Sequence, residues 1–267
     1  MSDAGAIAIT RYPAARGALW LREAFGMLSR ARGRWLMLVL LYYLIMAIVD
    51  VLPVIGRIAV PMLKPVFAVG FLAAAWSQER GEPPRLAQLF QGFRANLFAL
   101  LPLGVLLLVA ATVGALATML VDGGALLQVL SGRMQVDEAT LLSGSLQGAM
   151  VFGFVCVLPA LLALWYAPAL VVFHGCSAAH ALLFSLRASL VNWRALTVYM
   201  LLVLFYGVIV PGLAMAAIGL MVPGNAALAI ALTALLPYFL FMIATLHISD
   251  YVSYRDIFHA GEKATTG

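Results

Sequence analysis

The stretch that decides the fold covers residues 158–206 and reads LPALLALWYAPALVVFHGCSAAHALLFSLRASLVNWRALTVYMLLVLFY. It begins within an apolar helix that contains Pro159 and Pro168, turns at a polar corner over residues 174–177, and ends in a second apolar helix. Between them lies a short basic segment whose leucines recur at helical spacing, at Leu183, Leu186 and Leu190. An apolar stripe beside basic residues is typical of a helix that lies on a membrane surface. The stretch therefore predicts a spanning helix, a surface helix and a second spanning helix in succession.

The composition of the whole chain indicates a membrane protein. Of its 267 residues, 64% are hydrophobic and 10% are charged, with a mean hydropathy of +1.04. Soluble domains contain about 45–50% apolar and about 25% charged residues. Several apolar runs reach the ~18 residues that cross a hydrocarbon core about 30 Å thick. The first residues contain no apolar run, so we expect no cleavable signal peptide.

The hydropathy pattern predicts an all-α, polytopic integral membrane protein with one domain over residues 14–258. Six transmembrane helices are expected near residues 35–55, 58–77, 97–121, 148–173, 195–221 and 226–251. Three interfacial amphipathic helices are expected at residues 14–34, 85–94 and 177–194. The terminal residues 1–13 and 259–267 are expected to be flexible and cytoplasmic.

The distribution of basic residues predicts the orientation of the chain. Thirteen of the sixteen lysines and arginines fall in the two termini and in the loops at 78–96 and 174–194. The opposite loops contain the other three, Arg57, Lys64 and Arg133. Because cytoplasmic loops carry an excess of Lys and Arg, we expect both termini on the cytoplasmic side of a bacterial inner membrane. The same rule explains the net charge of +5, and we expect no nucleic-acid partner.

The three surface segments share a further pattern. Each has an apolar stripe that ends in an Arg-Ala pair and leads directly into a spanning helix, at Arg30-Ala31, Arg94-Ala95 and Arg187-Ala188. We interpret this pattern as a degenerate three-fold repeat of a surface helix followed by a helical hairpin. The alternative is that any cytoplasmic loop between leucine-rich spans is basic and amphipathic.

Three motifs resemble those of a known family. They lie at residues 165–170 (WYAPAL), 181–192 (ALLFSLRASLVN) and 251–258 (YVSYRDIF). With these motifs, the chain from residue 20 to residue 258 looks like a family of uncharacterised proteobacterial inner-membrane proteins named after a locus tag. The resemblance implies a six-helix inner-membrane protein, and it implies no activity, substrate or catalytic residue.

The leading functional hypothesis is a non-enzymatic factor that organises lipids or protein partners at the cytoplasmic leaflet. Basic residues beside a membrane attract anionic lipids. The candidate head-group contacts are Arg16, Arg22, Arg85, Arg94, Arg187 and Arg194. We expect membrane lipids, anionic ones above all, as partners, together with a protein partner or a second copy of the chain.

The end of the last span is a candidate docking site. Asp250 and Tyr254 share a helix face at i and i+4, and Arg255 follows directly. Asp250 is also expected to lie within reach of basic residues on a surface helix. The alternative is that the tyrosines anchor the helix at the interface and that Arg255 is an ordinary cytoplasmic stop signal.

A metal site and an enzyme site are both weakly indicated. His174, Cys176 and His180 form an H-x-C-x3-H cluster of transition-metal ligand types, but a three-residue cluster at a helix corner is more often simple interfacial polarity. The chain has no P-loop, Gly-rich dinucleotide fingerprint, H-E-x-x-H or G-x-S-x-G motif. We expect no metal, no cofactor and no catalysis.

The alternative function is a channel or transporter for a small neutral or amphipathic solute. Prolines occur in at least four spans, and broken helices often line substrate sites. This alternative predicts an internal cavity lined by Pro159, Pro168, Pro211 and Pro237.

Overall fold

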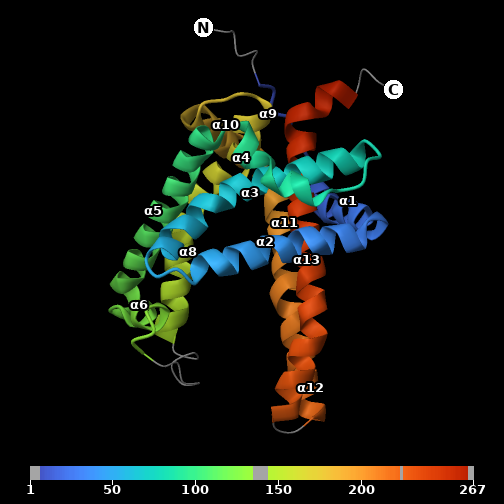
Figure 1. Ribbon diagram of the computed structural model, residues 1–267. Coiled ribbons are helices and arrows are strands. Elements are labelled where there is room, and N and C mark those ends of the chain that lie inside the picture. The colour runs from blue at the N-terminus through green and yellow to red at the C-terminus, as the bar shows by residue number, and fades with distance from the viewer. Residues whose placement is uncertain (1–6, 135–143, 223–224, 264–267) are drawn as a thin grey trace.

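A computed structural model describes residues 7–134, 144–222 and 225–263 of the chain (Figure 1). Six of its helices are long and apolar enough to cross a membrane. They are α2 (Arg32–Asp50), α3 (Ile55–Glu79), α5 (Leu97–Asp122), α8 (Gly144–Trp165) with α9 (Ala167–Phe173), α11 (Trp193–Leu204) with η2 (Phe205–Ile209) and α12 (Val210–Met221), and α13 (Asn225–Lys263). The predicted all-α fold with six transmembrane helices is confirmed.

Shorter elements connect the spans. They are α1 (Arg16–Arg30), η1 (Leu86–Phe90), α4 (Gln91–Ala95), α6 (Ala125–Leu130) and α10 (Ala178–Val191). The first surface helix is shorter than predicted, because the backbone breaks at Ala31 and α2 begins at Arg32. The second surface segment is a 3-10 turn followed by one short α-helix. The surface elements therefore differ in kind and length, and the three-fold repeat stays a prediction.

Part of each chain end that was predicted to be flexible lies within the described residues. The Thr10 backbone N–H donates to the Ile257 carbonyl at 2.9 Å, and the Tyr12 N–H donates to Asn192 Oδ1 at 2.9 Å. Residues 7–13 thus form a strap across α13 and the end of α10. At the other end, α13 continues to Lys263. The remaining parts of the two termini predicted to be flexible, 1–6 and 264–267, lie outside the described residues.

The spanning helices form three hairpins that diverge from one end of the molecule (Figure 1). The α5–α8 hairpin and the α11–α13 hairpin extend away from this end in different directions, and α2 and α3 cross between them. We call this end the platform. It comprises α1, η1, α4, α9, α10, residues 66–79 of α3 and residues 248–259 of α13.

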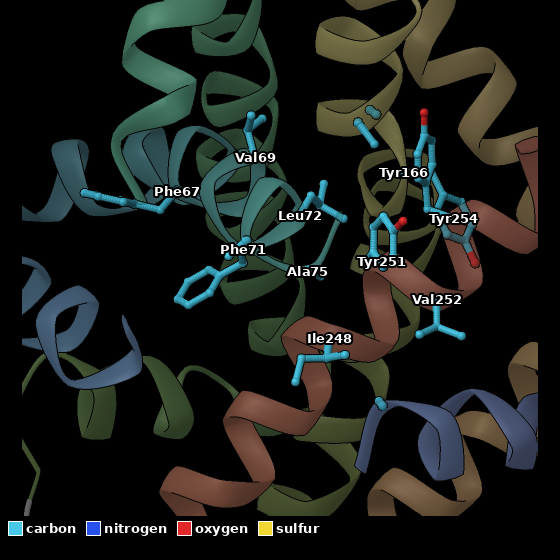
Figure 2. Close-up of a cluster of buried hydrophobic side chains, with 14 of the residues drawn as sticks. Phe67, Val69, Phe71, Leu72, Ala75, Tyr166, Ile248, Tyr251, Val252 and Tyr254 are labelled. Atoms are coloured by element: carbon cyan, nitrogen blue, oxygen red, sulfur yellow. The ribbon is translucent and has the colours of Figure 1, made fainter. Parts of the chain in front are cut away.

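The second half of α3 forms the centre of the platform. Its apolar side chains are buried nearly all round, unlike those of an ordinary amphipathic helix. Figure 2 shows Leu72 of α3 on the side of Tyr166 and Tyr254, which come from the α8–α9 junction and from α13, whereas Phe67 and Phe71 point to the other side of α3. The helices α2, α4, α5, α9 and α13 and the η1 turn all contact α3.

Glycines permit the closest helix contacts of the platform. A Cβ at Gly70 would lie 2.4 Å from the Leu89 carbonyl oxygen, and a Cβ at Gly17 would lie 2.0 Å from that of Ala195. Neither position has room for a side chain. By contrast, a Cβ at Gly212 in α12 would have no neighbour within 4 Å.

Two prolines interrupt helices, and side chains from other helices satisfy the backbone groups that are freed. In a regular helix the Tyr166 N–H would donate to the Leu162 carbonyl. Here it donates to Ser185 Oγ at 3.0 Å, and Leu162 O accepts from Ser185 Oγ at 3.0 Å and from Ser189 Oγ at 3.2 Å. The break before Pro168 is thus closed by two serines of α10.

The second interruption is the π-helical turn η2, which precedes Pro211. In this turn the Val210 N–H donates to the Phe205 carbonyl. The next i→i+5 donor, for the Tyr206 carbonyl, would be Pro211, which has no N–H. The Tyr238 hydroxyl of α13 donates to that carbonyl instead. This bond ties the two legs of the last hairpin together.

Candidate functional site: a basic platform and an apolar groove

Five charged side chains form an ion cluster inside the platform. Arg16 Nη2 lies 2.7 Å from Glu23 Oε1 and 2.6 Å from Asp256 Oδ2. Arg255 Nη2 lies 2.9 Å from Glu23 Oε2 and 3.1 Å from Asp256 Oδ1, and its Nη1 pairs with Glu79. The ion cluster therefore joins α1, α3 and α13.

Three side chains of the ion cluster are largely buried, so the cluster contributes to holding the platform together. The side chain of Asp256 is 2% exposed, that of Arg255 13% and that of Arg16 20%. Trp20 Nε1–H also donates to Asp256 Oδ2, at 3.1 Å. Burial alone would lower the pKa of Arg16, but its hydrogen bond to Asp256 and the charges of Asp256 and Glu23 raise the pKa above its ordinary value. Arg16 is thus a fixed cation that neutralises buried carboxylates.

This cluster changes the role of several predicted site residues. Arg16, predicted as a head-group contact, is engaged inside the protein. Tyr254 is buried and Arg255 is held by three carboxylates, so the structure does not present them with Asp250 as an open docking surface. The acidic residue that meets a surface-helix arginine is Asp256, and not Asp250 as predicted.

The other predicted head-group arginines are exposed on the platform or at its edge. Arg85 forms an ion pair with Glu82 at 3.5 Å, in which both side chains are well exposed, so the pair contributes little. Arg194 lies 5.4 Å from the ring of the neighbouring Trp193. The exposed arginines that form no ion pair with a described residue include Arg22, Arg30, Arg32, Arg34, Arg94, Arg187 and Arg194.

Acidic and basic groups are therefore segregated on the platform. Glu23, Glu79 and Asp256 are all engaged by Arg16 and Arg255. The outward surface of the same helices keeps arginines whose charge the described protein does not neutralise. Such a surface attracts anions, and beside a membrane the nearest anions are lipid head groups.

An open groove of about 600 Å³ runs between α1 and the last hairpin. Most of its wall is apolar, and two arginines, Arg22 of α1 and Arg32 at the start of α2, are its only charged lining residues among those described. The other lining residues are Leu21, Phe25, Leu28, Ser29, Tyr206, Tyr238, Phe241, Met242 and Thr245. We call this feature the α1 groove.

A separate small cavity of about 30 Å³ lies between α3, α9 and α13. His247 and Asp250 line it from α13, and Tyr166 lines it from the α8–α9 junction. His247 stacks on Phe71, with ring centroids 3.8 Å apart. A volume of this size is enough for about one water molecule, so the cavity is too small for an organic ligand.

The structure does not gather the predicted metal ligands into a site. His180 Nδ1 lies 2.9 Å from Ser177 Oγ, whereas His174 stacks near His259 with ring centroids 5.1 Å apart. Among residues 7–134, 144–222 and 225–263, no three His, Cys, Asp or Glu side chains are grouped as metal ligands. Burial raises the pKa of the Cys176 thiol, which disfavours the thiolate that a metal requires.

The prolines that motivated a transport path lie on different surfaces. Pro168 lines the small cavity beside His247, and Pro211 lines an open groove between α12 and α13. Pro159 and Pro237 lie on exposed faces of α8 and α13. The four prolines therefore do not line one internal cavity.

Two features of this site were missed from the sequence. Glu23 and Glu79 were not singled out, and nothing in a single sequence indicates that they meet Arg255 from a distance of more than 170 residues. The α1 groove was also missed. Its signal was present in the apolar face of the first surface helix, but the partner surface comes from a hairpin that is distant in sequence.

Comparison with known proteins identifies one clear relative. The chain is 30% identical over 254 residues to a probable inner membrane protein of Burkholderia thailandensis that is named by its locus tag, and the match covers 92% of each chain. No protein-family model matches the sequence. No solved structure matches it either.

Proposed function

We propose that this chain, which belongs to the family of the Burkholderia thailandensis inner membrane protein, gathers anionic phospholipids on the cytoplasmic side of the inner membrane and catalyses no reaction on them. The multi-pass inner-membrane location is the premise, since the relative is an inner membrane protein and six helices are long enough to span. Binding of lipid head groups by the platform is the proposed activity.

The observation that supports this proposal is the segregation of charge on the platform. Three carboxylates are taken up by Arg16 and Arg255 inside the protein, and this leaves a surface with arginines such as Arg94 and Arg187 unneutralised. Each arginine near a membrane surface contributes about 1 kcal/mol to the attraction of anionic lipid.

The proposal includes the orientation of the chain. The platform carries most of the arginines and both described ends of the chain, whereas Arg57 follows the turn between α2 and α3 and Arg133 follows α6, in the connections within the first two hairpins. The excess of basic residues favours the platform as the cytoplasmic face. We rank this function above a channel or transporter for a neutral or amphipathic solute, because the four helix prolines lie on separate surfaces.

The test compares two sets of arginine variants in nanodiscs that contain phosphatidylglycerol and phosphatidylcholine. The platform set replaces Arg94, Arg187 and Arg194 by glutamine. The control set replaces Arg57, Lys64 and Arg133, which are exposed near the opposite side. Mass spectrometry measures the phosphatidylglycerol retained per protein after mild detergent extraction.

We expect the platform set to lower the retained phosphatidylglycerol several-fold, because three favourable contacts of about 1 kcal/mol each are removed. The control set should retain as much as the wild type, since its residues do not face the proposed lipid surface. Equal retention by the platform set and the wild type would contradict the proposal.

A further inference from the structure

The α1 groove differs from the rest of the platform surface in its shape and in its lining. Its volume of about 600 Å³ lies within the range of roughly 300–1,000 Å³ that small-molecule sites occupy. Three apolar residues of α1 form one wall, and Phe241 and Met242 of α13 contribute to the opposite wall. A flat, lipid-facing helix surface has no such enclosed volume.

The groove joins the membrane interior to the basic surface. Thr245 and Tyr238 line it from α13, and they are separated by about 10 Å of helix at 1.5 Å per residue. The groove therefore extends from the α1 level into the part of the hairpin that spans the membrane. The part of an occupant that lies between the levels of Thr245 and Tyr238 must therefore be apolar.

The charges of the groove come from two adjoining helices. Arg22 lies on α1, and Arg32 begins α2 directly after the break at Ala31. Both arginines are exposed and line the groove, and neither forms an ion pair with a described residue. The occupant must therefore carry a negative group at the α1 end.

The backbone carbonyl that the π-helical turn frees inside the groove already has a hydrogen-bond donor. The Tyr206 carbonyl, which the π-helical turn leaves without a backbone donor, accepts from the Tyr238 hydroxyl. Because this carbonyl does not require a ligand donor, the deep part of the groove suits hydrocarbon. A polar solute would gain little there.

We infer that the α1 groove binds one anionic phospholipid, with its head group between Arg22 and Arg32 and an acyl chain along Tyr206, Tyr238 and Phe241. This inference rests on the proposed function, and it assigns a discrete site to one lipid among those that the platform attracts. Charge complementarity at the rim and hydrocarbon complementarity below it identify the occupant as a phospholipid. An uncharged apolar helix would leave both arginines without a counter-charge.

The experiment is native mass spectrometry of the full chain, which is delipidated and then titrated with phosphatidylglycerol or phosphatidylcholine. The groove variant is Arg22→Gln with Arg32→Gln. Its matched control is Arg57→Gln with Arg133→Gln, two exposed arginines outside the platform that do not line the groove. A third variant, Phe25→Ala, removes an apolar side chain that is 59% exposed, so its effect on folding should be small.

We expect the wild type and the control to bind one phosphatidylglycerol more tightly than further copies and more tightly than phosphatidylcholine. The groove variant should weaken this first binding step by about ten-fold or more, since two cationic contacts are lost. Phe25→Ala should weaken the binding of both lipids by a smaller factor. Thermal unfolding of each variant checks that the fold is intact.

The outcomes separate the groove from the general function. If the groove variant still binds the first lipid as the wild type does, or if the control weakens it equally, the discrete site is overturned. The general function is then tested separately, by the amount of lipid that the platform set of variants retains. A co-purifying polypeptide that the groove variant loses would also overturn the inference, because the occupant would then be a protein.

Discussion

Helix α3 and the α11–α12 leg of the last hairpin are both strongly apolar, but they lie in opposite environments. The most apolar window of α3 has a mean hydropathy of 1.9 and is 56% buried inside the protein, whereas that of Trp193–Met221 has a mean hydropathy of 2.4 and is 6% buried. The more apolar helix is thus the more exposed one. Hydropathy decides that a helix enters the membrane, and it does not decide whether protein or lipid surrounds it.

The difference lies in the polar and small residues that accompany the apolar ones. Near α3, glycines such as Gly70 permit backbone contact, and the adjoining ion cluster fixes the helix through Glu79. The α12 leg packs mainly on α13 and η2, and its Gly212 has open space around the Cβ position. Specific packing in a membrane therefore follows close contacts and hydrogen bonds, because lipid is as apolar as leucine.

The strongest test of the contrast is to remove the centre of the ion cluster. In Asp256→Ala, Arg16 and Arg255 lose a shared counter-charge in a largely buried position. Breaking a buried ion pair by removing one partner costs about 3–5 kcal/mol. We expect a large fall in thermal stability in detergent, measured by the loss of monodisperse protein on heating.

The matched control for this variant is Asp50→Ala at the end of α2. Asp50 is exposed and has no ion pair with a described residue. Its removal should change stability by less than about 0.5 kcal/mol. Similar losses in the two variants would show that the ion cluster does not hold the platform together.

Two glycine substitutions test close packing. We expect them to change the stability less than Asp256→Ala does. Gly17→Ala places a methyl group against the Ala195 carbonyl and the Tyr199 backbone, and the resulting strain should cost about 1–3 kcal/mol. Gly212→Ala has open space and replaces a poor helix former, so it should leave stability unchanged or raise it by up to about 1 kcal/mol. Thermal unfolding of both variants checks this. A neutral Gly17→Ala would mean that α1 can move away from α11.

Labelling of the two native cysteines tests the orientation of the chain. It is expected to have the smallest effect on the protein, because no residue is changed. Cys176 lies at the platform between α9 and α10, and Cys156 lies on an exposed face of α8 within a span. A membrane-impermeant maleimide should label Cys176 in inverted vesicles and not in intact spheroplasts, and it should not label Cys156 in either. Labelling of Cys176 from the outside would reverse the proposed orientation.

The same labelling has an expected pH dependence. The thiolate is the reactive form, and burial raises the pKa of Cys176 above its ordinary value. The labelling rate should therefore be low at neutral pH and should continue to rise at alkaline pH after a small exposed thiol has reached its plateau. Rates measured between about pH 7 and 10 with glutathione as the reference thiol test this; matching curves would contradict it.

The sequence motifs of the family turn out to be packing motifs. Tyr166 of the first motif donates its backbone N–H to Ser185 of the second, and its ring lies 5.6 Å from that of Phe258 in the third. Asn192, at the end of the second motif, holds the strap at residues 7–13. The three motifs build the platform together.

Two predicted assignments involve contacts between residues that are distant in sequence. The strap was expected to be flexible because residues 7–13 contain little local structure, and Arg16 was expected to face lipid because it begins an amphipathic segment. Both residue groups are positioned by the end of α13, more than 200 residues away in sequence. Local pattern carries no information about such contacts.

The sequence by itself determined that the chain is an all-α membrane protein with six spans, because the cost of placing polar groups in hydrocarbon acts on each segment independently. Only the tertiary structure decided which arginines neutralise buried carboxylates and which remain on the surface, and where α1 and the last hairpin leave a groove. These properties depend on the distances between segments. A hydropathy pattern fixes the depth of each segment in the bilayer, whereas only the folded chain fixes its neighbours.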